Sequence, residues 1–213
     1  DVLFDVVTEK FADLEFLFED LDKALVIEDI RTILQVAKSL LEYGVVEFIY
    51  AYGVIDVTSQ GADVINNVVY ELANLNILEG KKEQLLELVL GKVGIDDAEF
   101  DDYSWDEEIA ELQDVISEIF VLLEDNQLSS LVAIKQFAKV ENIKEIFENN
   151  QDQIINILHE VVESKLCVLG VVVGISKVLK GISNEDLQAL LDNVTTAELS
   201  EDILTLVNII DDV

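Results

Sequence analysis

The spacing of apolar residues most constrains the fold of this chain, because it follows the helical period over long stretches. After Trp105, apolar residues recur at intervals of three and four and form one stripe, at Ile109, Leu112, Ile116, Ile119 and Leu123. The 213 residues include no proline, a residue that interrupts helix interiors. The sequence therefore predicts an all-α protein with long helices and short connections.

Local signals support this prediction. Ser104 and Glu107 have the spacing of a capping box at the start of a helix. No segment alternates convincingly as a strand, because the β-branched run 171–173 has helical patterns on both sides. The expected helices cover residues 2–21, 24–43, 45–54, 60–77, 80–93, 105–125, 127–138, 141–149, 151–180 (with a break near Gly170 left open), 184–192 and 199–212.

The apolar template after Trp105 occurs more than once. It recurs 82 residues upstream, at Ile27, Ile30, Leu34, Ala37 and Leu41. It recurs again 94 residues downstream, at Ile203, Leu206, Ile210 and Val213. Two further pairs of segments match in the same order along the chain, 64–66 with 154–156 and 94–95 with 181–182. We therefore expect an imperfect internal repeat of roughly 80–95 residues.

Such repeats predict tandem multi-helix units that form a helical bundle or a short solenoid. The expected units are the tail of a preceding repeat at 1–21, a first repeat at 22–98, a second at 99–192 and the start of a further one at 193–213. The chain ends fall inside copies, and the first residue is Asp rather than Met. We expect the chain to be a processed product or a segment of a longer array.

The charge of the chain is strongly unbalanced, with 45 acidic residues against 13 basic ones and a net charge of −32. Nucleic acids and anionic membrane surfaces are disfavoured as partners, because both require clustered Lys and Arg. The apolar run 166–175 is too short to span a bilayer, so no membrane insertion is expected. Expected partners are divalent cations, copies of the same chain or neighbouring repeats, although acidity also serves solubility or salt adaptation.

Carboxylates are densest between the two full copies. Asp96, Asp97, Glu99, Asp101 and Asp102 are followed by three more acids at 106–108. Calcium takes six to eight oxygen ligands, so these residues form a candidate calcium site. The spacing is not that of an EF-hand. The alternative is a solvated linker whose acids favour the N-terminus of the next helix.

Catalytic groups are scarce. His159 is the only histidine and Cys167 the only cysteine, which excludes zinc sites and makes a Ser-His-Asp or Cys-His arrangement improbable. We expect His159 on a solvent-facing helix surface and Cys167 as a buried, inert thiol. Phosphate-binding glycine motifs are absent from the sequence. We predict a protein that is not an enzyme and has no cofactor apart from calcium; a carboxylate-pair hydrolase is the least favoured alternative.

Aromatic residues raise a different hypothesis. Phe48, Tyr50 and Tyr52 lie in a strongly apolar stretch. A soluble carrier of an apolar ligand or lipid could place a cavity near residues 45–55 and 166–175. An ordinary helical core explains the stretch more simply.

Three parts of the chain carry a resemblance to known proteins. They are the segment Ser-Trp-Asp-Glu-Glu-Ile-Ala-Glu-Leu at 104–112, Leu-Leu-Glu-Asp at 122–125 and the helices that end in Gly-Ile near 181. They resemble the tandem helical repeats of large surface or secreted proteins of low-GC bacteria. The resemblance implies an extracellular or cell-surface location and a scaffold, spacer or assembly role without catalytic residues. The first copy departs from the pattern, because Lys23 stands where the offset of 82 places Trp105.

Overall fold

The computed structural model describes residues 16–17, 19, 21–91, 104–164 and 166–167. In this part of the chain the structure is helical, with one isolated antiparallel bridge between Val54 and Ser130. The all-α prediction is confirmed there, while the helices expected at 184–192 and 199–212, and nearly all of 2–21, lie outside the described residues. The elements are α2 (Lys23–Tyr43), α3 (Val45–Tyr50), α4 (Ser59–Ala73), the 3-10 helix η2 (Asn76–Leu78), α5 (Lys82–Gly91), α6 (Trp105–Asp125), α7 (Leu131–Phe137), the 3-10 helix η4 (Val140–Asn142), α8 (Ile143–Asn149) and α9 (Gln151–Glu163).

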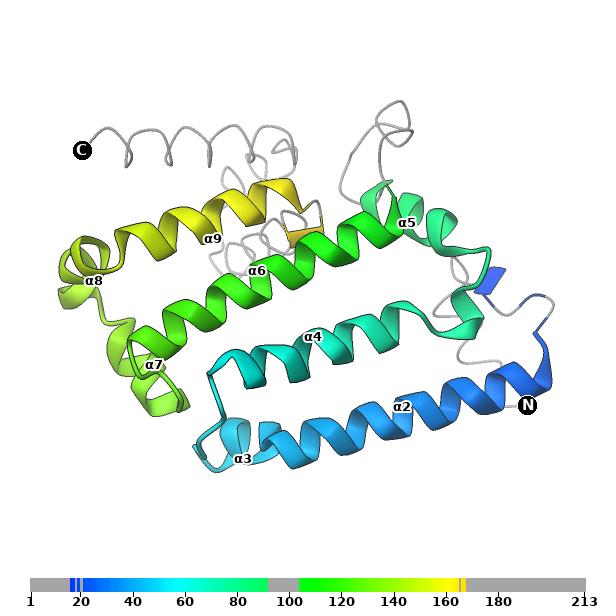
Figure 1. Cartoon of the computed structure of the whole chain (residues 1–213), viewed down its shortest axis with the longest axis horizontal. Helices are drawn as coiled ribbons and strands as arrows, with labels where there is room; N and C mark the ends of the chain where they lie inside the picture. The colour runs from blue at the N-terminus through cyan, green and yellow to red at the C-terminus, as the bar shows by residue number, and fades with distance from the viewer. Residues whose placement is uncertain (1–15, 18, 20, 92–103, 165, 168–213) are drawn as a thin grey trace, which may run out of the picture.

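Four of these helices lie side by side in chain order, α2, α4, α6 and α9, and each runs antiparallel to the one before it (Figure 1). The short helix α3 connects α2 to α4 at one end of the row, and α7 and α8 connect α6 to α9 at the same end. Among the described elements, α4 and α6 each pack between two of these helices. The helices at the two edges, α2 and α9, pack against one each.

The helices α2 and α6 match in length and in their starting signals. Each has 21 residues, and they begin 82 residues apart. A side-chain oxygen caps each N-terminus: Asp22 accepts from the Ala24 amide at 2.7 Å, and Ser104 accepts from the Glu107 amide at 3.4 Å. The Ser104 half of the predicted capping box is therefore present. Gly44 ends α2 with φ of 89°, a left-handed conformation that favours glycine.

The buried core is divided among the contacts between successive helices. Between α4 and α6, the buried residues Val57, Ala62 and Phe120 form one cluster, against which pack the partly buried Tyr43, Ile55, Ile65, Ile116 and Leu123. A second cluster surrounds Val162 of α9, with Ile155, Leu158 and Val161. The first cluster joins residues of α4 and α6, whereas the residues of the second all belong to α9.

Several helices are shorter than the periodicity predicts. The helix expected at 45–54 ends at Tyr50, and the chain then turns at Tyr52, which has a positive φ of 55°. Beyond this turn the Ile55 amide donates to the Ser129 carbonyl at 3.0 Å. The helix expected at 127–138 starts only at Leu131, because Gln127 adopts a positive φ of 55° after α6. Apolar residues in these connections pack against the row, which gives them a helix-like pattern without a helix.

Two long predicted helices are also divided. The one expected at 60–77 ends at Ala73 and is followed by η2, whose amides are held by a carboxylate of α2. The one expected at 151–180 ends at Glu163, before Gly170, because Ser164 takes an extended conformation. Ser164 is fully buried, and its hydroxyl accepts from the Cys167 amide at 3.2 Å. A long-range hydrogen bond to Asp29 accompanies the first end, and a local one between Cys167 and Ser164 follows the second.

Candidate functional site

The candidate calcium ligands Asp96, Asp97, Glu99, Asp101 and Asp102 lie outside the described residues. The three acids that follow them occupy different environments. Asp106 binds a lysine, Glu107 is exposed, and Glu108 is only 2% exposed and accepts from the Leu166 amide at 3.2 Å. Among the residues that the structure describes, no group of three or more His, Cys, Asp or Glu side chains is placed to hold a metal ion.

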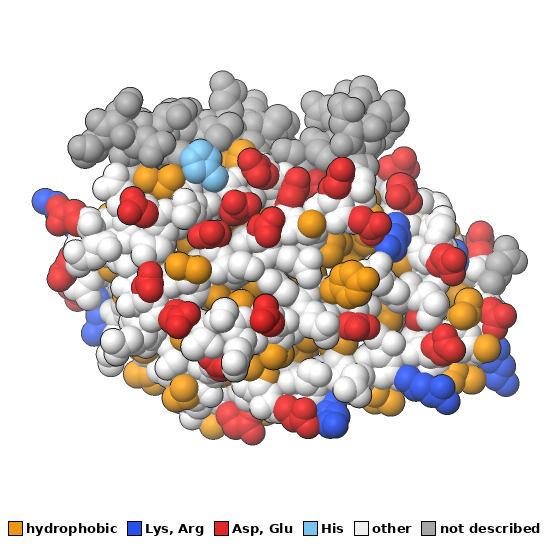
Figure 2. Space-filling view, viewed as in Figure 1, with side chains coloured by type: hydrophobic (Ala, Val, Ile, Leu, Met, Phe, Trp, Pro, Cys, Tyr) orange, Lys and Arg blue, Asp and Glu red, His pale blue; other side chains and the backbone are white. Residues whose placement is uncertain are grey.

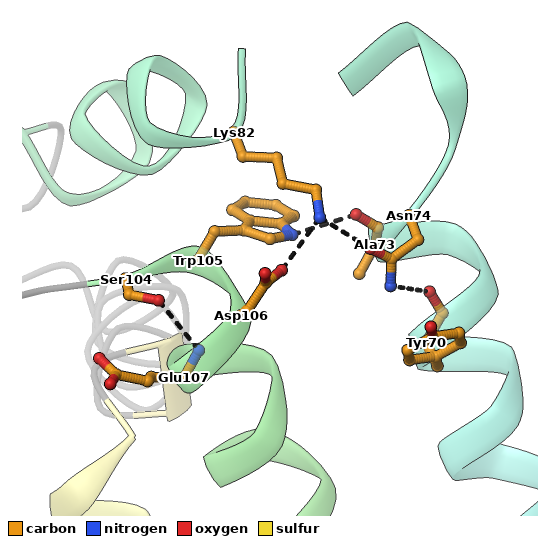
Figure 3. A network of polar contacts seen from close by, with 8 residues as sticks. All are labelled: Tyr70, Ala73, Asn74, Lys82, Ser104, Trp105, Asp106 and Glu107. Atoms are coloured by element: carbon orange, nitrogen blue, oxygen red, sulfur yellow. Dashed lines mark hydrogen bonds and ion pairs between the residues drawn. The ribbon is translucent and has the colours of Figure 1, made fainter. Parts of the chain in front are cut away.

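The start of α6 is a polar junction that joins three helices (Figure 3). The Lys82 ammonium of α5 lies between the Asn74 amide oxygen at 2.7 Å and the Asp106 carboxylate at 2.9 Å. The Trp105 indole nitrogen donates to the Ala73 carbonyl at 3.1 Å, at the end of α4. The Lys82 ammonium, the Asn74 side chain and the Trp105 indole all bind groups of the protein itself, so this junction fixes the ends of α4, α5 and α6 relative to one another.

The single histidine lies on α9, and the single cysteine follows the end of that helix. His159 is exposed on α9, as expected from its position in the periodicity. Cys167 is half-buried rather than fully buried. Burial raises the pKa of its thiol, and Glu108 and Glu111 act in the same direction, while the Ser164 hydrogen bond opposes them. A thiol with a raised pKa is a weak nucleophile at neutral pH.

The aromatic residues of the ligand-carrier hypothesis do not enclose a cavity. Tyr50 is 81% exposed and Tyr52 is 53% exposed, while Phe48 is half-buried. The Lys135 ammonium lies 5.2 Å from the centroid of the Tyr52 ring, which covers that ring with a cation on the surface. Most of the other expected wall, residues 168–175, lies outside the described part.

The apolar stripe of α2 faces away from α4. Ile27, Ile30, Leu34 and Leu41 are 43%, 51%, 64% and 58% exposed, although they have the same spacing as the stripe of α6. In α6 the corresponding residues are mostly covered, since Ile116 and Leu123 pack against the cluster shared with α4. In the space-filling view, orange, blue and red side chains border the lower edge, where α2 lies (Figure 2). Exposed apolar residues grouped in this way mark an interaction surface.

Basic residues border this stripe. Arg31 and Lys38 are exposed and lie one helical turn from Leu34, and Lys23 is exposed at the start of the same helix. Lys38 pairs with Glu42 at 3.6 Å, a weak surface ion pair. We call the set Lys23, Ile27, Ile30, Arg31, Leu34, Lys38 and Leu41 the outer face of α2. It is apolar and basic in a chain that is otherwise strongly acidic.

The opposite edge of the row has the reverse character. Asp152, Asn156, His159 and Glu163 are exposed on α9 at intervals of three and four, so they share one side of the helix. We call this set the outer face of α9. Its buried counterpart, Val162 with Leu158, belongs to the apolar cluster of the same helix. Neither outer face can be identified from the sequence, because an apolar stripe does not show which side of a helix has a neighbour.

Comparison with models of known protein families, with curated proteins and with solved structures finds no match to this chain. The fold and the two outer faces are therefore the observations from which a function has to be argued. None of the described helices is both long enough and apolar enough to cross a membrane.

Proposed function

We propose that this chain is a non-catalytic structural segment of an acidic helical repeat protein that acts outside the cell or at its surface as a scaffold, spacer or assembly subunit. The observation that carries the proposal is the correspondence between α2 and α6. Both have 21 residues, and their starts are separated by the same 82 residues that relate their apolar stripes.

The correspondence extends to which side of each helix meets the next helix. Asp125 of α6 binds Gln153 of α9 at 2.8 Å, and its counterpart Tyr43 binds the Asp56 carbonyl just before α4. On the other side, Ile116 of α6 packs toward α4, and its counterpart Leu34 lies on the outer face of α2. In this interpretation, α2 and α6 are the first helices of two repeats. Each has one face for the helix that follows it and another for a helix that precedes it, as in a repeat array.

The acidic surface suits such a segment. Exposed carboxylates keep a chain with large helical faces soluble, because like charges repel non-specific contacts. Calcium at Asp96, Asp97, Glu99, Asp101 and Asp102 would offset part of this repulsion where the two proposed copies meet. Labelling of intact cells with an antibody against the chain tests the location; signal that appears only after lysis would contradict it.

Hydrogen exchange tests the array architecture. In an array, each helix is stabilised mainly by its neighbours, so a cavity between α2 and α4 loosens those helices and leaves distant ones unchanged. Val36 is 7% exposed on α2. We expect Val36→Ala to speed amide exchange in α2 and α4 and to leave α9 as in the parent protein. An equal increase in all four helices would indicate a single cooperative core and contradict the array.

A matched variant and an activity screen complete the test. Val162→Ala, at an equally buried residue of α9, should speed exchange in α9 and α6 and leave α2 unchanged. Turnover of ester, glycoside or peptide substrates, with or without divalent metal, would contradict the non-catalytic part of the proposal.

A further inference from the structure

We propose that the outer face of α2 binds the outer face of α9 of a second copy of this chain, head to tail. This inference rests on the repeat architecture of the proposed function and names its partner. Both faces are exposed, and both belong to edge helices of the row. Within one chain, α4 and α6 form the corresponding contact with different side chains.

The helix α9 corresponds to α4 at an offset of 90 residues, which aligns Ile65-Asn66 with Ile155-Asn156. The side of α4 that meets α6 includes Ala62 and Asn66. Their counterparts Asp152 and Asn156 lie on the outer face of α9. Since α6 corresponds to α2, the α4–α6 contact provides a template for α9 of one copy against α2 of another.

The first pair of corresponding positions holds apolar side chains in the α4–α6 contact and charged side chains on the two outer faces. Ala62 and Phe120 lie in one buried cluster between α4 and α6. Their counterparts are Asp152 on α9 and Lys38 on α2, which carry opposite charges. A contact made by van der Waals packing within the chain would thus become an ion pair between copies. Random drift on an acidic surface would more often place two carboxylates together.

The second and third pairs lie further along the same contact. Trp105 donates to the carbonyl of Ala73, and the counterparts of these residues are Lys23 and Glu163, again of opposite charge. Gln113 donates to the carbonyl of Asn66 at 2.9 Å, and the counterpart of Gln113 is Arg31, the only arginine of the chain. Arg31 can donate to the corresponding carbonyl of Asn156, since a guanidinium carries five N–H donors.

The same template covers the apolar residues of the outer face of α2. Ile116 and Leu123 pack against the cluster that α4 shares with α6, and their counterparts are the exposed Leu34 and Leu41. The basic and apolar outer face of α2 also suits the outer face of α9, where the carboxylates Asp152 and Glu163 are exposed. Because the two faces differ, the contact repeats from copy to copy and forms open chains or rings rather than a two-fold symmetric dimer.

Sedimentation velocity on charge-reversal variants tests the pairing. We expect the parent protein to form oligomers that lengthen with concentration. The single variants K38E and D152K should each weaken association about tenfold, because one attraction becomes a repulsion. The double variant K38E/D152K has the net charge of the parent and restores the opposite-charge pair, so it should associate as the parent does. An equimolar mixture of the two single variants should also associate.

Matched controls separate this pairing from general charge effects. K144E and E87K change the net charge by the same amounts at exposed sites away from both faces, and they should leave association at the level of the parent. A parent protein that stays monomeric at all concentrations would overturn the proposal. Failure of the double variant to restore association would overturn it as well. Neither result would alter the exchange pattern that tests the array.

Discussion

The Asp29 carboxylate of α2 is joined to Asn76 of η2 by two hydrogen bonds, at 2.7 Å to the backbone nitrogen and 2.9 Å to the side-chain amide. The same carboxylate accepts from the Ile77 amide at 2.7 Å, and Asp29 is only 6% exposed. A buried acid in an apolar interface is stable because three N–H donors surround it. This group fixes where α4 ends and where the chain turns toward α5.

Asp29→Ala should lower the free energy of unfolding by about 3 kcal/mol, because two backbone amides lose their acceptor in a part-buried place. Urea unfolding followed by circular dichroism measures the change. Glu28→Ala, at the exposed neighbouring position, is the control and should change stability by less than about 0.5 kcal/mol. Equal effects from the two variants would show that the carboxylate is not structural.

Gly61, in the first turn of α4, is buried where the chain before the helix crosses it. A Cβ atom built on Gly61 would overlap the Asp56 carbonyl oxygen, which also accepts a hydrogen bond from the Tyr43 hydroxyl. Gly61→Ala should therefore displace this loop and lower stability by about 3 kcal/mol, although alanine favours helices. Thermal melts compare it with Gln60→Ala at the adjacent exposed residue. A gain in stability for Gly61→Ala would contradict the close approach.

The carboxyl group of Glu160 on α9 should make the free energy of unfolding depend on pH. Burial raises the pKa of this carboxyl above 4.5, and Glu163, Asp114 and Glu118 raise it further, while His159 opposes them. A folded-state pKa above the unfolded value means that the protonated form favours folding. The contribution is fully present below about pH 4.5 and is lost as the pH rises through the folded-state pKa.

Glu160→Gln should therefore be more stable than the parent protein at pH 7, and the difference should shrink as the pH falls toward 4.5. Unfolding free energies of both proteins between pH 4 and 7 give this difference. General protonation of the 45 acidic residues affects both proteins alike, so the difference isolates one carboxyl. A difference that does not change with pH would refute the prediction.

Thermal unfolding with and without calcium tests the proposed calcium site at Asp96, Asp97, Glu99, Asp101 and Asp102. If these carboxylates bind calcium in the folded protein, millimolar calcium should raise the melting temperature at low ionic strength. Replacing all five residues with Asn or Gln should abolish the increase. Magnesium at the same concentration is the control for general screening, because it prefers a smaller, octahedral site. An unchanged melting temperature would remove calcium from the proposal.

The sequence by itself determined the helical class and the position of the central helix. The apolar stripe from Ile109 to Leu123, with Ser104 as a cap, predicted the helix 105–125 to the residue. Periodicity and capping act within a few turns of chain, so local sequence is enough to define such a helix. The acidic surface and the exposed position of His159 follow from the same local pattern.

Only the tertiary structure decided which stripes are buried and where several helices end. Ile116 and Leu34 lie at the same place in two stripes of the same spacing, yet one packs toward α4 and the other is 64% exposed, because α2 lies at the edge of the described row. The end of α4 likewise depends on Asp29, which lies 47 residues from Asn76 in sequence. Burial and long-range hydrogen bonds depend on which elements become neighbours. The spacing of apolar residues along one helix does not specify its neighbours.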